Sequence, residues 1–218
     1  MTTTDDTILT SLPQTRESSL DVLRELAVGL AQQFTVALED CARLIRTEPV
    51  EQTTPAMLTS ISKGVANFGR FDAAITEKTV PERAHEPLRQ LARAYLSGFE
   101  AVGAVALLSQ QTTLPVEAPQ LVELAAKSAR ALQQLTDLVF GNRHLGSVDS
   151  TFAYVGSLEN QADALFRAGV RQLAKASSGD VTQPGDVATR YRSLVSLELL
   201  TDRCEEIAES LLLVYWLE

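Results

Sequence analysis

Apolar residues recur at steps of three and four along most of this chain, which is the spacing that places them on one face of an α-helix. Val and Ile follow the same helical spacing instead of alternating, so no strand is expected. The pattern predicts six helical stretches, separated at proline, glycine and polar turn residues. They run from Ser18 to Glu48-Pro49, from Thr54-Pro55 to about Lys78, from the junction at Pro81 and Pro87 to about Leu108, from near Pro119 to Gly141-Asn142, from Asp149 or Ser150 to about Ala176, and from Asp186 nearly to Glu218.

The order and length of these stretches predict two similar halves, each with three long helices. The halves share no clear repeat at the level of single residues, so this prediction rests on helix length and order alone. We expect an all-α fold of two three-helix bundles packed side by side. The first bundle covers residues 17–112 and the second covers 113–218, after a polar, flexible tail at 1–16.

Composition and charge narrow the classes of function. The 218 residues include 19 Lys and Arg against 28 Asp and Glu, which gives a net charge of −9. Nucleic-acid phosphates need a basic surface, so nucleic-acid binding is not expected, whereas a cation or a basic partner would suit this chain. The chain opens without the basic start and apolar stretch of a secretory signal, and its apolar runs are shorter than the roughly 20 residues that span a bilayer. A soluble, cytoplasmic protein is expected.

The last two stretches each carry a pair of acidic residues at a spacing of four. Glu159 and Asp163 are four residues apart, as are Glu198 and Asp202, and Glu206 follows four residues later. Residues at this spacing lie on one helix face, where like charges destabilise the helix. If the two stretches form an antiparallel hairpin, both pairs lie roughly 20 Å from its turn, at about 1.5 Å of rise per residue. The two acidic pairs would then lie level with each other.

Two interpretations of the acidic pairs stay open at this point. The carboxylates lie on the shoulder of each apolar stripe, where side chains line the contact between helices. A hard cation bound by oxygen ligands would relieve their mutual repulsion. The same spacing also arises from solvated surface acids, because 28 acidic residues in a helical chain form such pairs by chance.

Two longer strings surround these acidic pairs. They are Leu158-Glu159-Asn160-Gln161-Ala162-Asp163-Ala164-Leu165-Phe166-Arg167 and Leu200-Thr201-Asp202-Arg203-Cys204-Glu205-Glu206-Ile207-Ala208. In composition and order they resemble the last two helices of the PhoU-like phosphate-transport-regulator family, in particular its smaller members that accompany low-affinity inorganic phosphate transporters. Residues 150–218 carry nearly all of the resemblance, and the first 145 residues match only in helix count and spacing.

The resemblance implies a fold of two three-helix bundles and a cytoplasmic regulator without enzymatic activity, which works with a phosphate transporter of the inner membrane. In the family, acidic-x-x-x-Asp motifs on paired helices hold multinuclear iron or zinc clusters, one in each bundle. Carried over to this sequence, the matching residues are Glu159, Asp163, Glu198 and Asp202, with Glu206 as an addition. The resemblance therefore implies at most one iron or zinc cluster, in the second bundle.

The first half departs from the family pattern. Neither Asn67-Phe68-Gly69-Arg70-Phe71-Asp72 nor Arg89-Gln90-Leu91-Ala92-Arg93-Ala94-Tyr95 holds an acidic pair, and Asp72 and Glu100 are single. A metal cluster in the first bundle is therefore not expected. This departure motivates a second hypothesis, a metal-free helical interaction module with an unrelated partner. A metal-dependent hydrolase or oxidase is a third, which needs an open coordination position and a base.

Few other residues suggest chemistry. Cys41 and Cys204 are far apart in the sequence and are expected to act as small apolar residues. His85 and His144 lie near predicted helix ends, and no Glu-x-x-His pattern supports a di-iron carboxylate oxidase.

The chain ends in the apolar run 211–217. A helix that is apolar on all sides is normally buried. We therefore expect the run to dock in the protein's own core, with Trp216 as its probe. The alternative is that a homodimer partner covers it.

Overall fold

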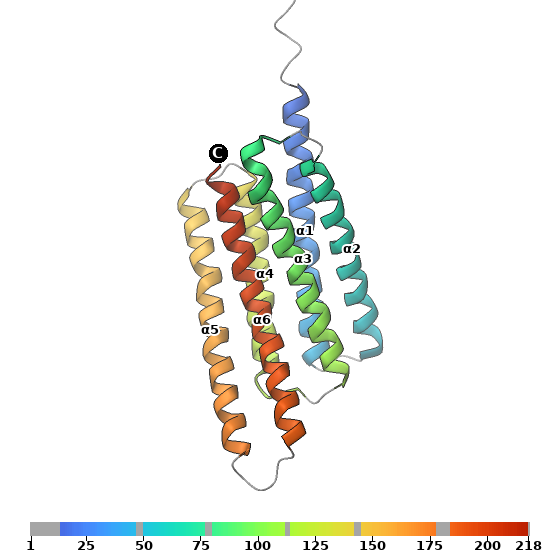
Figure 1. Ribbon diagram of the computed structural model, residues 1–218, viewed down its shortest axis with the longest axis vertical. Helices are drawn as coiled ribbons and strands as arrows, with labels where there is room; N and C mark the ends of the chain where they lie inside the picture. The colour runs from blue at the N-terminus through green and yellow to red at the C-terminus, as the bar shows by residue number, and fades with distance from the viewer. Residues whose placement is uncertain are drawn as a thin grey trace, which may run out of the picture.

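The chain folds into six long helices (Figure 1). The computed structural model describes residues 14–46, 50–76, 80–111, 114–141, 145–177 and 184–217. The helices are α1 (Gln14–Arg46), α2 (Val50–Thr76), α3 (Glu82–Gln111), α4 (Ala118–Val139), α5 (Leu145–Ser177) and α6 (Pro184–Tyr215). No strand occurs within these described ranges. The predicted all-α fold is confirmed.

Some helices begin earlier than the apolar spacing predicts. α1 begins at Gln14 and not at Ser18, and α2 begins early enough that Pro55 lies inside it. Apolar spacing marks only the turns that face a core, whereas polar turns extend a helix without that signal. Of the predicted tail at 1–16, residues 14–16 belong to α1, and the remainder lies outside the described residues.

The helices run alternately up and down the long axis and form two groups of three (Figure 1). Helices α1, α2 and α3 contact one another, and so do α4, α5 and α6. Between the groups, α1 packs on α4 and α3 packs on α6, whereas the contacts of α2 and α5 stay within their own groups. This packing agrees with the predicted pair of three-helix bundles, with α2 and α5 at the outer edges.

Two buried hydrogen bonds join the bundles. The hydroxyl of Thr35 on α1 donates to the carbonyl oxygen of Ala129 on α4, at 3.1 Å. The hydroxyls of Tyr95 on α3 and Thr136 on α4 lie 3.1 Å apart. Buried polar groups that have found partners favour one arrangement of the packed helices over others.

The interiors of the two bundles differ in composition. In the first bundle, the ring of Phe34 packs edge-to-face against Tyr95 and Phe99, with ring centroids 5.9 and 5.5 Å apart. Phe71 is also fully buried there. The buried apolar side chains of α4, α5 and α6 are aliphatic, apart from Cys204. Edge-to-face pairs add stability beyond the area they bury, so the first bundle has the more specifically packed core.

The C-terminal run of α6 is only partly inside the core. Leu211 is buried, but Leu213 and Trp216 are 50% and 64% exposed. The run lies at the end of the last helix, so one side of it faces the bundle and the other side is exposed to solvent. The prediction of core docking is therefore wrong for Trp216, whose ring packs edge-to-face against that of Tyr215, with centroids 5.5 Å apart.

Helix α3 is long and apolar enough to cross a membrane by length and composition, and it is the one such helix among the described residues. Half of its most apolar stretch is buried in the protein, where α3 contacts α1, α2 and α6. The core helix of a soluble protein gives the same pattern, so the cytoplasmic location stays a prediction.

Candidate functional site: an acidic seam between α5 and α6

Five carboxylates lie along the contact between α5 and α6, and we call this set the acidic seam. Its members are Glu159 and Asp163 on α5, and Glu198, Asp202 and Glu205 on α6. The two helices are antiparallel neighbours (Figure 1), so their turns pass each other in reverse order. Side chains three or four residues apart stay on the same side of each helix, and the seam follows from this spacing.

The carboxylates of the acidic seam repel one another across the two helices. Partial burial, followed by the charges of Asp202, Asp163 and Glu159, raises the pKa of Glu198 to about 7. Partial burial, followed by the charges of Asp163 and Asp202, also raises the pKa of Glu159. These interactions cross from α5 to α6, so the structure brings together the four residues that the sequence placed at one level.

Glu205 is a member of the acidic seam that the sequence analysis did not select. Its Oε1 would stand 3.7 Å from a Cβ added at Gly156, so it lies against α5. Partial burial, followed by the charges of Glu159, Glu209 and Asp202, raises the pKa of Glu205. A search in steps of four residues passes over Glu205, whereas a step of three from Asp202 reaches it.

Glu206, which the sequence analysis did select, lies at the margin of the acidic seam. It is exposed, and it forms an ion pair with Arg203 on its own helix. Partial burial is the largest cause that raises the pKa of Asp202, and the charge of Glu206 is the next. The charge of Glu206 therefore still acts on the acidic seam. Glu206 therefore adds to the negative potential without facing α5 in the way that Glu205 does.

Two arginines neutralise part of this negative charge. Arg167 pairs with Asp163 on α5, and Arg203 pairs with Glu206 on α6. The other four members of the acidic seam form no ion pair with any residue that the structure describes. The seam therefore keeps more negative charge than its neighbours balance.

The acidic seam offers oxygen donors only, which is the donor type that hard cations prefer. Within the described residues, no three Asp, Glu, His or Cys side chains stand in an arrangement that holds a metal ion. A cation would also have to compete with Arg167 for Asp163. The residues fit a metal in donor type, charge and level along the helices, and their side chains would have to turn toward one another to bind it.

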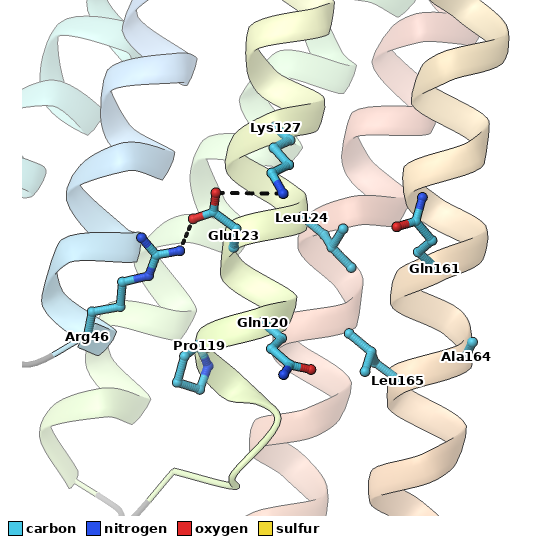
Figure 2. A pocket seen from close by; sticks show the side chains of 9 residues that line it. All are labelled: Arg46, Pro119, Gln120, Glu123, Leu124, Lys127, Gln161, Ala164 and Leu165. Atoms are coloured by element: carbon cyan, nitrogen blue, oxygen red, sulfur yellow. Dashed lines mark hydrogen bonds and ion pairs between the residues drawn. The ribbon is translucent and has the colours of Figure 1, made fainter.

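A cavity of about 610 Å³ lies away from the acidic seam, between the end of α1, α4 and α5 (Figure 2). Gln161 of α5 lines this cavity, whereas Glu159 and Asp163 beside it in the sequence belong to the acidic seam. Figure 2 shows that Arg46 and Lys127 both point to Glu123, and the Lys127 Nζ lies 3.9 Å from its Oε1. One carboxylate thus engages both cations, so this cavity presents no charged group of its own that lacks a partner.

The other sequence candidates lie in the core or near helix ends. Cys41 and Cys204 are both buried. Burial, followed by the charge of Asp40, raises the pKa of Cys41 to about 12, so this thiol stays protonated. The Nε2 of His85 lies 3.1 Å from a backbone carbonyl oxygen, and His144 lies outside the described residues. The acidic seam remains the strongest candidate from the sequence.

Comparison with models of known protein families and with curated proteins gave no match.

Proposed function

We propose that this chain is a non-enzymatic, cytoplasmic regulator or accessory protein of inorganic phosphate transport. One observation carries the proposal: the two strings that resemble the PhoU-like family lie against each other on α5 and α6, with their carboxylates at one level. The fold of two three-helix bundles is the one that the resemblance implies. In the first bundle, the segments 67–72 and 89–95 hold no acidic pair, so the proposed chemistry belongs to the second bundle alone.

We further propose that the second bundle holds one iron or zinc cluster. Glu159, Asp163, Glu198 and Asp202 would bind it, and Glu206 would add negative charge from the margin. When bound, the metal supplies positive charge that stabilises the ionised carboxylates. The chain's own contribution is to hold these carboxylates on two packed helices, where their repulsion favours a cation.

The proposed partner is a phosphate transporter of the inner membrane, contacted from the cytoplasmic side. A net charge of −9 favours partner surfaces that carry basic residues. It also makes nucleic acid a poor partner, because phosphate backbones repel an acidic protein. A homodimer is a further proposal, since Leu213 and Trp216 expose apolar surface at the end of α6.

The alternative function is a metal-free helical interaction module with an unrelated partner. The ion pairs Arg167–Asp163 and Arg203–Glu206 favour this alternative, because each arginine already occupies a carboxylate that a metal would need or would benefit from. In that case the uncompensated carboxylates of the acidic seam bind basic side chains of the partner.

Elemental analysis tests the metal part of the proposal. The protein is purified without chelator and without a His-tag, beside the double variant Glu159→Ala/Asp202→Ala. The matched control is Asp72→Ala/Glu100→Ala, which removes two single carboxylates from the first bundle. We expect at least one iron or zinc atom per chain in the wild type and the control, and loss of metal from the seam variant. Trace metal in all three proteins would favour the metal-free alternative.

The transport part of the proposal has a separate test. Removing the chain from its own cell should change the uptake of radiolabelled phosphate, and cross-linking in cells should recover a phosphate transporter. Unchanged uptake together with no such cross-link would contradict the regulator function whether or not the protein holds metal.

A further inference from the structure

A second acidic group, Glu117, lies apart from the acidic seam at the start of α4. Glu117 is only 8% exposed, although its side chain makes no capping hydrogen bond to α4. Its Oε1 has no hydrogen-bond donor among the described residues. The backbone N–H groups of Gln120 and Leu121 donate to the carbonyl oxygen of Glu117, so the helix start is satisfied without the carboxylate.

The neighbouring helices show that this burial is built into the packing. A Cβ added at Gly169 on α5 would stand 3.1 Å from the carboxyl carbon of Glu117 and 2.9 Å from Cδ1 of Leu194 on α6. The missing side chain at Gly169 therefore makes room for the carboxyl group where α4, α5 and α6 meet. A buried carboxylate without a donor is costly, so a partner for Glu117 is expected.

Glu117 lines a cavity of about 320 Å³, which is near the lower limit for small-molecule sites. The apolar part of the wall comes mainly from Leu114, Pro115 and Leu173. Arg190 of α6 lines the same cavity and forms no ion pair within the described part of the chain. The lining of the cavity thus includes a buried glutamate and an exposed arginine, neither in an ion pair within the described residues, beside an apolar wall.

We propose that this cavity binds a small zwitterion, a free amino acid with an aliphatic side chain. Its ammonium group donates to the carboxyl group of Glu117, whose buried Oε1 must rotate toward the cavity, and its carboxylate accepts hydrogen bonds from Arg190. Its aliphatic side chain packs against Leu114 and Leu173. A simple cation would be repelled by Arg190, and a simple anion would be repelled by Glu117, so a ligand with both charges fits best.

Gln172 also lines the cavity, and its amide offers a further donor and acceptor. The site shares no residue with the acidic seam, so the inference is independent of the proposed function.

The first test uses the wild-type protein and matched ligands. Isothermal titration calorimetry and thermal unfolding are recorded with L-alanine, L-valine and L-leucine. They are repeated with 3-methylbutylamine, which is leucine without the carboxylate, and with 4-methylpentanoate, which is leucine without the ammonium group. We expect at least one amino acid to bind and to raise the Tm, and both single-charge analogues of leucine to bind at least tenfold more weakly than leucine. Absence of binding by all three amino acids would overturn the proposal, and so would binding of 3-methylbutylamine as tight as that of leucine.

The second test uses the variants Glu117→Gln and Arg190→Gln, with Arg192→Gln as the control. Arg192 is an exposed arginine on the same helix and is not part of the cavity wall. Each of the first two variants should weaken amino-acid binding at least tenfold, because each removes a charge-assisted hydrogen bond. The control should bind like the wild type. Unchanged binding in Glu117→Gln would also overturn the proposal, and the ligand series on the wild type decides the matter if that variant does not fold.

Discussion

The two bundles use their glycines for different purposes. In the first bundle, a Cβ at Gly64 would stand 2.1 Å from the ring of Phe99, and one at Gly98 would stand 2.7 Å from the ring of Phe34. In the second bundle, a Cβ at Gly169 would stand 2.9 Å from Cδ1 of Leu194 and 3.1 Å from the carboxyl carbon of Glu117, whereas one at Gly156 would be in ordinary contact with Glu205, at 3.7 Å. The absent side chains at Gly64 and Gly98 make room for aromatic rings, and that at Gly169 makes room for an aliphatic side chain and a carboxyl group.

This difference separates stability from binding within one fold. A core of close-packed rings loses stability when atoms are removed or added. Carboxylates held near one another destabilise the folded state, and binding of a cation or a basic partner restores that stability. The first bundle should therefore respond most to changes of volume, and the second bundle to changes of charge and pH.

The largest effect is expected from Phe34→Ala, because this ring contacts both Tyr95 and Phe99 in the first core. Loss of a buried phenylalanine side chain should lower the free energy of unfolding by about 3–5 kcal/mol. Urea denaturation followed by circular dichroism measures it. Leu107→Ala is the control, since Leu107 is 59% exposed on α3 and should stay within about 0.5 kcal/mol of the wild type. A small effect of Phe34→Ala would show that the aromatic core is not the stable part.

The next effect tests whether the glycine of the first bundle is required by the ring beside it. Gly64→Ala places a methyl group within the ring of Phe99, and overpacking of this kind costs about 1–3 kcal/mol. The gain of Ala over Gly in a helix, about 1 kcal/mol, offsets part of that cost.

Gly69→Ala on the same helix is the matched control for Gly64→Ala. Nothing lies within 4 Å of a Cβ at Gly69, so this variant should be stabilised by about 0.5–1 kcal/mol. Opposite signs for the two variants in thermal unfolding would support the comparison. Stabilisation of both would mean that Phe99 moves aside freely.

The helix number and order were predictable because apolar positions at steps of three and four persist over many turns. Helix starts were not, since the polar turns before Ser18 carry no such signal. Counting residues along a hairpin predicted that Glu159 and Asp163 lie level with Glu198 and Asp202. The choice between Glu205 and Glu206 did not follow, because it depends on how α6 is rotated about its own axis.

Glu117 shows a second reason why part of a site stays hidden in a sequence. Its burial depends on Gly169 and Leu194, which belong to two other helices and are more than fifty residues away in the sequence. A single glutamate before a helix is otherwise an ordinary surface residue. Only the packing of α4 against α5 and α6 gives it a cavity and places Arg190 in the same wall.

The third effect is a pH dependence that belongs to the second bundle. The pKa of Glu198 is about 7 in the folded chain, against a usual value of 4.5. At pH values between these two pKa values, the folded state binds more protons than the unfolded state. Stability is therefore highest at the acidic end of this pH range and falls as the pH rises through 7. Without metal, Glu198→Gln should remove on the order of 1 kcal/mol of the stability difference between pH 5.5 and pH 8, because solvent screening reduces the effect of a partly exposed group.

Denaturation in a chelator-containing buffer at both pH values measures this difference. Glu100→Gln is the matched control, because Glu100 is an exposed single carboxylate on α3. It should leave the pH dependence unchanged. Equal pH dependence in the wild type and Glu198→Gln would mean that the carboxylates of the acidic seam do not interact as their positions require.

The smallest effect is expected from Arg167→Gln, which releases Asp163 from its ion pair. The pair is exposed and lies within one helix, so its loss should lower the free energy of unfolding by only about 0.3–0.5 kcal/mol. Arg167 also lowers the pKa of Glu159, so its removal should steepen the loss of stability toward high pH. If the acidic seam binds metal, the same variant should bind it more tightly, since Asp163 no longer has a competing cation. Weaker metal binding in Arg167→Gln, measured by competition with a metallochromic dye, would indicate that the arginine orients Asp163 for the metal.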